Sequence, residues 1–382
     1  MHETRDAARR LTVIAQGRSA RSHWDEIGAA DDDLPLSQTP TWMDCVCASG
    51  RYADATTVYR TPEGGRLVLP LASRLIGGVP VGVLKSLPSG WDLGRDSGGL
   101  IREGGGRPTV DDVRAVVADL RRRTAVRIHV VPSHRDEAAW ADAAEGLPGS
   151  TYRVHELDLS GGFDTVWKER FTSKARSNSR KAARRGVEVE LDSSGRLIET
   201  FERLYRKSVE RWAQQERLPV AISRHLSLRR EPVDKFATVA RALGDQCVVA
   251  MAWRAGEPVA GIIVLSKGRQ ATFWRGAMDK ELAQSTGANE LLHRTMIERA
   301  CSAGQQAYDM GRSFRSDLSS FKEGFGAEAK FVTGYAAERV PLLVAEERLR
   351  RGVKTLLRSI PRGESHSAPQ PLPVDHAAGD TA

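Results

Sequence analysis

The residues best suited to chemistry lie near the end of the chain, in the run YDMGRS (308–313) and the turn FKEGF (321–325). Asp309 ends an apolar, strand-like stretch, and side chains at strand ends of open α/β sheets face ligand crevices. A carboxylate there can position an acceptor amine or accept its proton. Lys322 can supply a fixed positive charge for a developing oxyanion or a phosphate. We therefore predict Asp309 and Lys322 as catalytic residues, with an ion pair from Asp309 to Lys322 or Arg312 as the purely structural alternative.

A second candidate site is the segment QSTGAN (284–289), which precedes a stretch with helical apolar spacing that closes at Gly304. Backbone N–H groups at a helix N-terminus can cradle a phosphate, and Gly287 would let the backbone approach it closely. The predicted donor-binding residues are Gln284, Gly287, Ala288 and Asn289. The structural alternative is an ordinary helix cap, because a short Gln-x-x-Gly often arises by chance.

A basic run extends from Lys168 to Arg185 and contains a single acidic residue, Glu169. In a helix, Arg176, Arg180 and Arg184 would form one stripe, and like charges at this spacing repel by a few tenths of a kcal/mol, roughly, per pair. An anion bound along the stripe would relieve that repulsion. A solvated basic face is the alternative.

These segments resemble one known family, the Fem-type acyltransferases with a GNAT (acetyltransferase-like) fold, which include CelD-like bacterial proteins. The resemblance rests on the helix that ends at Gly304, on YDMGRS, on FKEGFGA (321–327) and on SKARSNSRKAARRGVEVE (173–190). It implies two GNAT-like domains in tandem, the first degenerate and forming one wall of the acceptor cleft. It also implies that the basic run is a helix bordering that cleft.

On this resemblance, Ser173, Asn178 and Arg180 are expected to face the cleft, and the turn with Lys322 to lie beside the donor. The segment from Gln284 looks like the GNAT pyrophosphate loop, Gln/Arg-x-x-Gly-x-Gly/Ala, with Asn289 in place of the last small residue. Arg312 and Trp274 complete the expected substrate-binding set; for Trp274, a place in the core is the alternative.

The donor implied by the GNAT resemblance is an acyl-CoA thioester, whereas the Fem resemblance implies an aminoacyl-tRNA. The two helices expected between Leu191 and Cys247 are short, so the long helical arm of many peptidoglycan-bridge enzymes is not expected, and acyl-CoA is preferred. The acceptor would be an amine on an amino sugar, a cell-wall precursor or a metabolite. A role in cell-envelope biogenesis follows from the same resemblance.

The elements that would position these residues follow a mixed α/β pattern, with strands first and alternating helices and strands afterwards. Strand-like runs at 56–59, 66–76 and 79–86 precede a helix at 110–123, and a long helix is expected at 163–185. We predict a degenerate GNAT-like domain at 1–160 and an acyltransferase domain at 161–340. A basic amphipathic helix at 341–360, able to touch an anionic membrane, and a disordered tail at 361–382 would follow.

The composition of the chain limits the class of protein to which it can belong. The chain has 382 residues, 40% of them hydrophobic, and a formal charge of +8 that suits an anionic ligand. No apolar run reaches the length of a membrane span and the first residues are polar, so a cytoplasmic protein is expected. The four cysteines form no Cys-x-x-Cys motif, so no metal site is expected.

The sequence lacks the motifs of serine hydrolases, P-loop NTPases and zinc proteases. A non-catalytic module that binds RNA or another anion is the remaining alternative.

Overall fold

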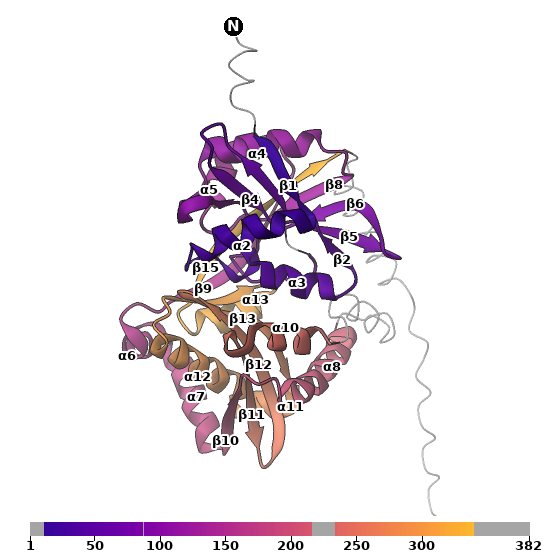
Figure 1. The fold of residues 1–382 in the computed structure, drawn as a ribbon. Helices are drawn as coiled ribbons and strands as arrows, with labels where there is room; N and C mark the ends of the chain where they lie inside the picture. The colour runs from indigo at the N-terminus through magenta and orange to yellow at the C-terminus, as the bar shows by residue number, and fades with distance from the viewer. Residues whose placement is uncertain (1–10, 87, 216–233, 340–382) are drawn as a thin grey trace, which may run out of the picture. The chain divides into compact units, whose positions relative to one another are not determined.

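The backbone is organised around one long mixed β-sheet (Figure 1). The computed structural model describes residues 11–86, 88–215 and 234–339. The strands of the long sheet, in spatial order, are β10 (Val187–Asp192), β11 (Cys247–Arg254), β12 (Glu257–Lys267), β13 (Gln270–Met278), β14 (Ala307–Arg312), β9 (Gly149–Asp158), β15 (Glu328–Glu338), β8 (Arg127–Val130), β6 (Val79–Lys85), β5 (Ala72–Ile76) and β2 (Tyr52–Asp54). The mixed α/β fold expected from the sequence is confirmed.

The first half of the chain adds a second, smaller sheet. It consists of β1 (Thr12–Gln16), β3 (Thr57–Arg60), β4 (Arg66–Leu69) and β7 (Ile101–Arg102), with the helices α2 (Arg21–Ala29), α3 (Pro40–Ala48), α4 (Val110–Arg122) and α5 (Glu137–Ala143). Helix α4 begins with a capping box between Thr109 and Asp112, which satisfies two backbone donors that the helix leaves unpaired. Its apolar side packs into a core that includes Trp140 and Leu67.

The helices of the second half cover both faces of the sheet. They are α6 (Gly162–Thr165), α7 (Ser173–Arg184), α8 (Ile198–Gln215), α10 (Lys235–Leu243), α11 (Lys280–Thr286), α12 (Ala288–Ser302) and α13 (Ser316–Glu323). Along β11, side chains alternate between two cores: Val249 and Met251 join the α8 and α10 side, whereas Val248 and Ala250 join the α7 and α12 side. Because successive side chains of a strand point to opposite faces, this apolar run is buried on both.

The long helix expected at 163–185 is instead interrupted. A π-helical turn at Val166–Arg170 follows α6, and Phe171 is extended before α7 starts. Phe171 packs edge-on against Phe325, with ring centroids 5.1 Å apart, and Thr172 caps α7 by accepting a hydrogen bond from Ala175 N–H. The break thus lets an aromatic residue enter the core and gives α7 its own cap.

The last strand joins both halves of the chain. Residues 328–335 of β15 pair with β9, and 335–338 pair with β8. The expected boundary near residue 160 falls just after β9. We keep 1–160 and 161–340 as proposed domains. The expected amphipathic helix and tail at 341–382 lie outside the described residues. Among the residues described, no helix has the length and apolar content needed to cross a membrane.

Candidate active site

The two strands that carry most of the candidate residues pair only briefly. β13 and β14 are parallel partners from Gln270 and Ala307 to Thr272 and Asp309, and β13 then continues to Met278 without β14 as a partner. Each strand has an irregularity there. Trp274 is an extra residue opposite β12, and the register of β14 shifts between Asp309 and Arg312. Such bulges bend strands and redirect side chains, and they are common beside active sites.

Asp309 lies at the point where the two strands part, and it is fully buried. Its carboxylate accepts hydrogen bonds from the backbone N–H groups of Arg95 and Gly311, each at 2.6 Å. Burial raises the pKa of Asp309 to about 7, although both N–H groups favour the ionised form. Gly94 covers the carboxylate so closely that a side chain there would overlap it. Asp309 therefore fastens the segment around Gly94 to the sheet.

Lys322, on α13, is only 2% exposed. Its Nζ donates hydrogen bonds to the carbonyl oxygens of Gly311 (2.9 Å) and Arg312 (2.8 Å). Burial lowers the pKa of Lys322 to about 8, while Asp309 and Asp92 act in the opposite direction. The structure thus brings the two predicted catalytic residues to the same strand end. The ions of Asp309 and Lys322 bind main-chain groups, and within the described ranges no ion pair is formed between them.

A second charged group joins Asp92, a loop residue, to Arg275 of β13 and Arg312 of β14, and it is partly exposed. A carboxylate oxygen of Asp92 lies 3.8 Å from the guanidinium of Arg275, and the side chain of Asp92 is 30% exposed. Burial opposes ionisation of Asp92, but Arg275 and then Arg312 hold its pKa below the usual range. Lys235 adds a third positive charge nearby. Asp92 is thus held charged at a partly exposed position.

Aromatic rings form the wall beside this charged group. Trp274 packs against Trp42 and Phe236, with centroids 5.6 and 5.5 Å apart, and its Nε1 is buried without a hydrogen-bond acceptor. Lys235 Nζ lies 4.3 Å from the ring centroid of Trp91. The predicted substrate residue Arg312 stacks on Tyr152, with its guanidinium carbon 3.4 Å from the ring centroid. Trp274 is thus a core residue that also borders the group around Asp92.

The predicted phosphate loop is mostly helical, which corrects the sequence expectation. Gln284 belongs to α11, and Gly287, with φ 81°, ends that helix by donating its N–H to Ala283. A side chain at Gly287 would come within 2.6 Å of the carbonyl oxygen of Asn178, so the glycine permits contact between α7 and α12. Ala288 is fully buried and Asn289 donates to the sulfur of Met278 at 3.1 Å.

The three predicted residues of the basic helix lie at different places on α7. Ser173 and Arg180 are exposed, and Arg180 stacks on Trp167 at 5.4 Å. Asn178 is held by Glu290 through a 2.8 Å hydrogen bond. Arg176 caps the preceding turns by donating to carbonyls that include those of Trp167 and Lys168. Part of the basic run therefore stabilises the fold, and in the described part of the chain Lys322 binds the carbonyls of Gly311 and Arg312 rather than any of these residues.

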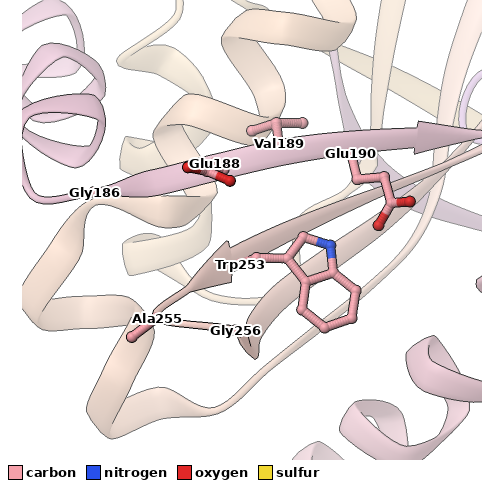
Figure 2. Close-up of a pocket in the computed structure, with 7 residues that line it drawn as sticks. All are labelled: Gly186, Glu188, Val189, Glu190, Trp253, Ala255 and Gly256. Carbon is pink, nitrogen blue, oxygen red and sulfur yellow. The ribbon is translucent and has the colours of Figure 1, made fainter.

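Two surface hollows lie away from the strand ends. The larger is lined by residues of β10 and β11 and the turn after β11, with Trp253 between Glu188 and Glu190 (Figure 2). The other is bordered by 158–162 and 301–306. Neither includes Asp309 or Lys322, so the candidate site rests on the bulges and the charged groups beside them.

Sequence reasoning missed Asp92, Arg275 and Lys235. They come from a loop, a strand and a helix that are far apart in the chain, and none forms a spaced motif. The bulge at Trp274 is also invisible in the sequence, because it depends on the pairing with β12. The glycine-rich stretch at 89–107 is typical of a loop, but its composition does not show which strand the loop would meet.

Comparison with known proteins identifies the architecture. Residues 169–323 match the family described as Acetyltransferase (GNAT) domain. The crystal structure of FemX superposes on 89% of this chain and 100% of its own, with a TM-score of 0.58 at 12% identity. The chain has a Fem-type GNAT fold. The match to the GNAT domain contains β13, β14 and Lys322, whereas Asp92 and Gly94 of the candidate site lie outside it.

A second solved structure supports the same fold. The C-terminal domain of a putative lysylphosphatidylglycerol synthetase from Agrobacterium fabrum matches with a TM-score of 0.50 and 15% identity, over 87% of this chain and 97% of its own. No curated protein matches the sequence. The match to the GNAT domain supports acyl transfer as the general type of reaction, and the solved structures support the fold.

The residues of α11 and α12 fit the pyrophosphate of coenzyme A poorly. The N–H of Gly287 is engaged by α11, and the carbonyl of Asn178 fills the space beside it. The first turn of α12 also contains the carboxylate of Glu290, which would repel a phosphate. Donor binding at Gln284, Gly287, Ala288 and Asn289 therefore remains a prediction that this geometry does not favour.

Proposed function

We propose that the protein is an N-acyltransferase that moves an acyl group from a thioester donor of the acyl-CoA class to an amine. The acceptor class is an amino sugar, a cell-wall precursor or a metabolite amine. The observation that carries the proposal is the separation of β13 and β14 within the GNAT domain, with a bulge on each strand. Residues 273–277 of β13 have no second strand partner within the described parts of the chain, and an extended, amide-bearing donor can add to this edge as a strand. At Met278 the edge ends, because Ser208 and Arg211 of α8 bind the backbone there.

The residues of the chain have separate tasks in this proposal. Arg275 and then Arg312 lower the pKa of Asp92, and this charged group lies beside the end of β14. Asp309 and Lys322 are positioning residues, because both are buried and bind the main chain on either side of Gly311. They hold the end of β14 in the bent form that leaves the edge of β13 open.

A second candidate is an aminoacyl-tRNA-dependent transferase acting on a cell-wall or peptide precursor. The exposed basic side of α7 favours it, since Lys174, Arg180 and Arg184 all face solvent. A polyanion along this helix would relieve the repulsion of its like charges. The two proposals share the β13 edge and differ in the donor.

Calorimetry with the full chain separates them. Acetyl-CoA, longer acyl-CoAs and a mixed pool of aminoacyl-tRNA are titrated in parallel, with free tRNA and coenzyme A as controls. Saturable binding of a CoA thioester supports the main proposal, and binding of charged tRNA alone supports the second. Binding of neither overturns both and leaves a non-catalytic anion-binding module.

The role of Lys322 is tested by Lys322→Met, which keeps the length of the side chain and removes its charge. We expect turnover to fall at least about tenfold with little change in KM, because loosening the strand end disturbs alignment rather than binding. The alkaline limb of the kcat profile near pH 8 should also disappear, since the pKa of Lys322 is about 8. Lys330→Met, on an exposed part of β15, is the control. Wild-type kinetics in Lys322→Met would remove this residue from the site.

A further inference from the structure

The hairpin between β5 and β6 has an apolar tip that is exposed to solvent. Ile76 and Val79 are cross-strand partners, and they are 61% and 63% exposed. Gly77 and Gly78 join them, and a side chain placed at either glycine would meet no atom within 4 Å. Single exposed apolar residues are common on protein surfaces, but two β-branched residues side by side on a bare turn form a patch. The tip is therefore a candidate contact surface.

The tip extends beyond the elements next to it (Figure 1). A side chain at Gly82 would lie 3.0 Å from a methyl carbon of Val126, so Gly82 marks the level at which the chain enters β8. From Gly82, β6 runs back three residues to Val79, which is about 10 Å at the rise of a strand. Val126 itself is 37% exposed. The hairpin is thus a projection with apolar side chains at its end and at its base.

Exposed arginines lie at the base of this projection. Arg121 and Arg122 are in the last turn of α4, and both are exposed. Arg339 is exposed as well, and its backbone N–H donates to the carbonyl of Val126 at 3.1 Å. The Nε of Arg339 donates to the carbonyl of Arg123 at 3.2 Å. The end of α4, the start of β8 and the end of β15 therefore meet beside the hairpin.

The carboxylates beside these arginines are largely engaged by other cations. Asp119 is paired with Arg123 at 2.8 Å, and Glu338, only 5% exposed, is paired with Arg127 at 2.9 Å. Glu145 is exposed and lies near the end of α4, where its carbonyl oxygen accepts a hydrogen bond from an arginine. The base of the projection thus has more exposed positive than negative charge, which attracts an anionic partner.

We propose that the β5–β6 tip enters the surface of an anionic lipid bilayer, with Arg122 and Arg339 at the phosphates of the lipid headgroups. Ile76 and Val79 then leave water for the boundary between headgroups and acyl chains. Arg339 is bound beside Val126, about 10 Å behind the tip, and interfacial segments enter a bilayer by about 5–10 Å. This inference goes beyond the proposed acyl transfer and does not depend on it.

Both the apolar tip and the arginines are needed for this contact. Full burial of one isoleucine or valine side chain strengthens binding by about tenfold to a hundredfold. Each arginine near an anionic membrane surface adds about fivefold. One weak anchor gives only marginal, reversible attachment, so the two contributions have to act together. We therefore expect binding to anionic bilayers, little binding to neutral ones, and a loss of binding as salt screens the charges.

A second copy of the chain is the competing partner for the tip. In a two-fold symmetric dimer built on the hairpin, the same surface of each copy faces the other. The exposed arginines at the base of one hairpin would then face those of its symmetry mate and repel them. An anionic bilayer instead pairs each arginine with a phosphate. The charge around the tip thus favours the membrane over the dimer.

Vesicle sedimentation with the full chain tests the proposal. The vesicles are phosphatidylcholine alone, or phosphatidylcholine with about 30% phosphatidylglycerol. Ile76→Asp and Val79→Asp should each lower binding to the anionic vesicles at least about tenfold. Arg122→Gln and Arg339→Gln should each lower it about fivefold.

Matched controls change similar residues elsewhere on the surface. Phe331→Asp alters an apolar residue of β15 that is 64% exposed, and Arg203→Gln removes an exposed arginine of α8. Both should bind vesicles like the wild type. Melting curves establish that each variant is folded, and little change is expected because the altered side chains are exposed.

Hydrogen exchange of the wild-type chain locates the contact without any variant. The amides of residues 76–79 should exchange at least about tenfold more slowly when anionic vesicles are added, and at an unchanged rate with neutral vesicles. Slower exchange at the tip together with the losses in Ile76→Asp and Val79→Asp would support the proposal.

Four results would overturn it. The wild type could fail to bind anionic vesicles, or it could bind neutral vesicles equally well. Unchanged binding in Ile76→Asp and Val79→Asp, with unchanged exchange at 76–79, would place the membrane contact elsewhere, for example at 341–360. A wild-type dimer in light scattering that becomes a monomer in Ile76→Asp would assign the tip to a second copy of the chain.

Discussion

Asp309 at the end of β14 and Asp92 in a neighbouring loop are two aspartates whose pKa values are shifted in opposite directions. Asp309 is sealed under Gly94 and is held by two backbone N–H groups, and its pKa rises to about 7. Asp92 keeps part of its exposure and faces Arg275 and Arg312, and its pKa falls below the usual range. The dipoles of two N–H groups do not offset the free-energy cost of burying the charged form of Asp309. The full charges of Arg275 and Arg312 do offset that cost for Asp92.

The two aspartates therefore have different roles in the structure. A carboxylate without a cation in contact is expensive to ionise, so Asp309 is tolerated because it ties the segment around Gly94 to β14. Arg275, Arg312 and Lys235 lower the pKa of Asp92, so this carboxylate stays charged. The sealed group thus shapes the site and the open group can meet a substrate.

The largest expected effect comes from changing the close contact between Gly94 and the carboxylate of Asp309. Gly94→Ala should destabilise the fold by about 2–4 kcal/mol, because the residue has φ 60° and its new methyl group would overlap the carboxylate of Asp309. Gly104→Ala is the control: it has φ 81° and no atom within 4 Å of the added carbon, so it should lose only about 1 kcal/mol. Urea unfolding measures both. Equal losses would show that Asp309 is not sealed as described.

The next effect is the pH dependence that Asp309 imposes. Its pKa is about 7 in the folded chain and about 3.9 when unfolded, so the folded form binds more protons between these values. Stability should therefore fall as pH rises from about 4 to about 7, by up to about 4 kcal/mol. Asp309→Asn should flatten this slope in urea midpoints measured from pH 4.5 to 8.5, whereas Asp164→Asn, at an exposed position, should not. An unchanged slope in Asp309→Asn would contradict the assignment.

The smallest effect is at Asp92 and has the opposite sign. Because its folded pKa is lowered, the carboxylate stabilises the fold above its unfolded pKa, and this contribution is lost as the pH falls through the folded pKa. Asp92→Asn should cost about 1 kcal/mol at pH 7, since the side chain is partly solvated, and the difference should shrink toward pH 3. If Asp92→Asn were more stable than the wild type at pH 7, the three cations would not depend on this carboxylate.

Local sequence signals predicted many elements well. The helix expected at 110–123 is α4 at Val110–Arg122, and the turn at Gly77-Gly78 separates β5 from β6 as expected. In these places apolar periodicity, a cap and turn residues all agree. The break at Phe171 was missed because its cause, contact with Phe325, lies more than a hundred residues away.

The candidate site could also be predicted from the sequence only where the signal is local. Asp309 and Lys322 could be found because each ends a readable local motif, but their sealing by Gly94 depends on a loop from the other half of the chain. Ser313 Oγ lies 2.9 Å from Nδ1 of His155 with no spacing signal in the sequence, since only the pairing of β9 with β14 brings these residues together. The motif around Gly287 had a clear local pattern, and the structure uses it to pack α7 on α12.

The position of β15 has a consequence for biosynthesis. β9 and β8 are made early, yet the strand that lies between them is the last of the described chain, at Glu328–Glu338. While the ribosome is still translating the GNAT domain, both strands expose an unpaired edge that another nascent chain could occupy. We expect the amino-terminal half to depend on chaperones until translation reaches β15, and to aggregate when it is expressed alone.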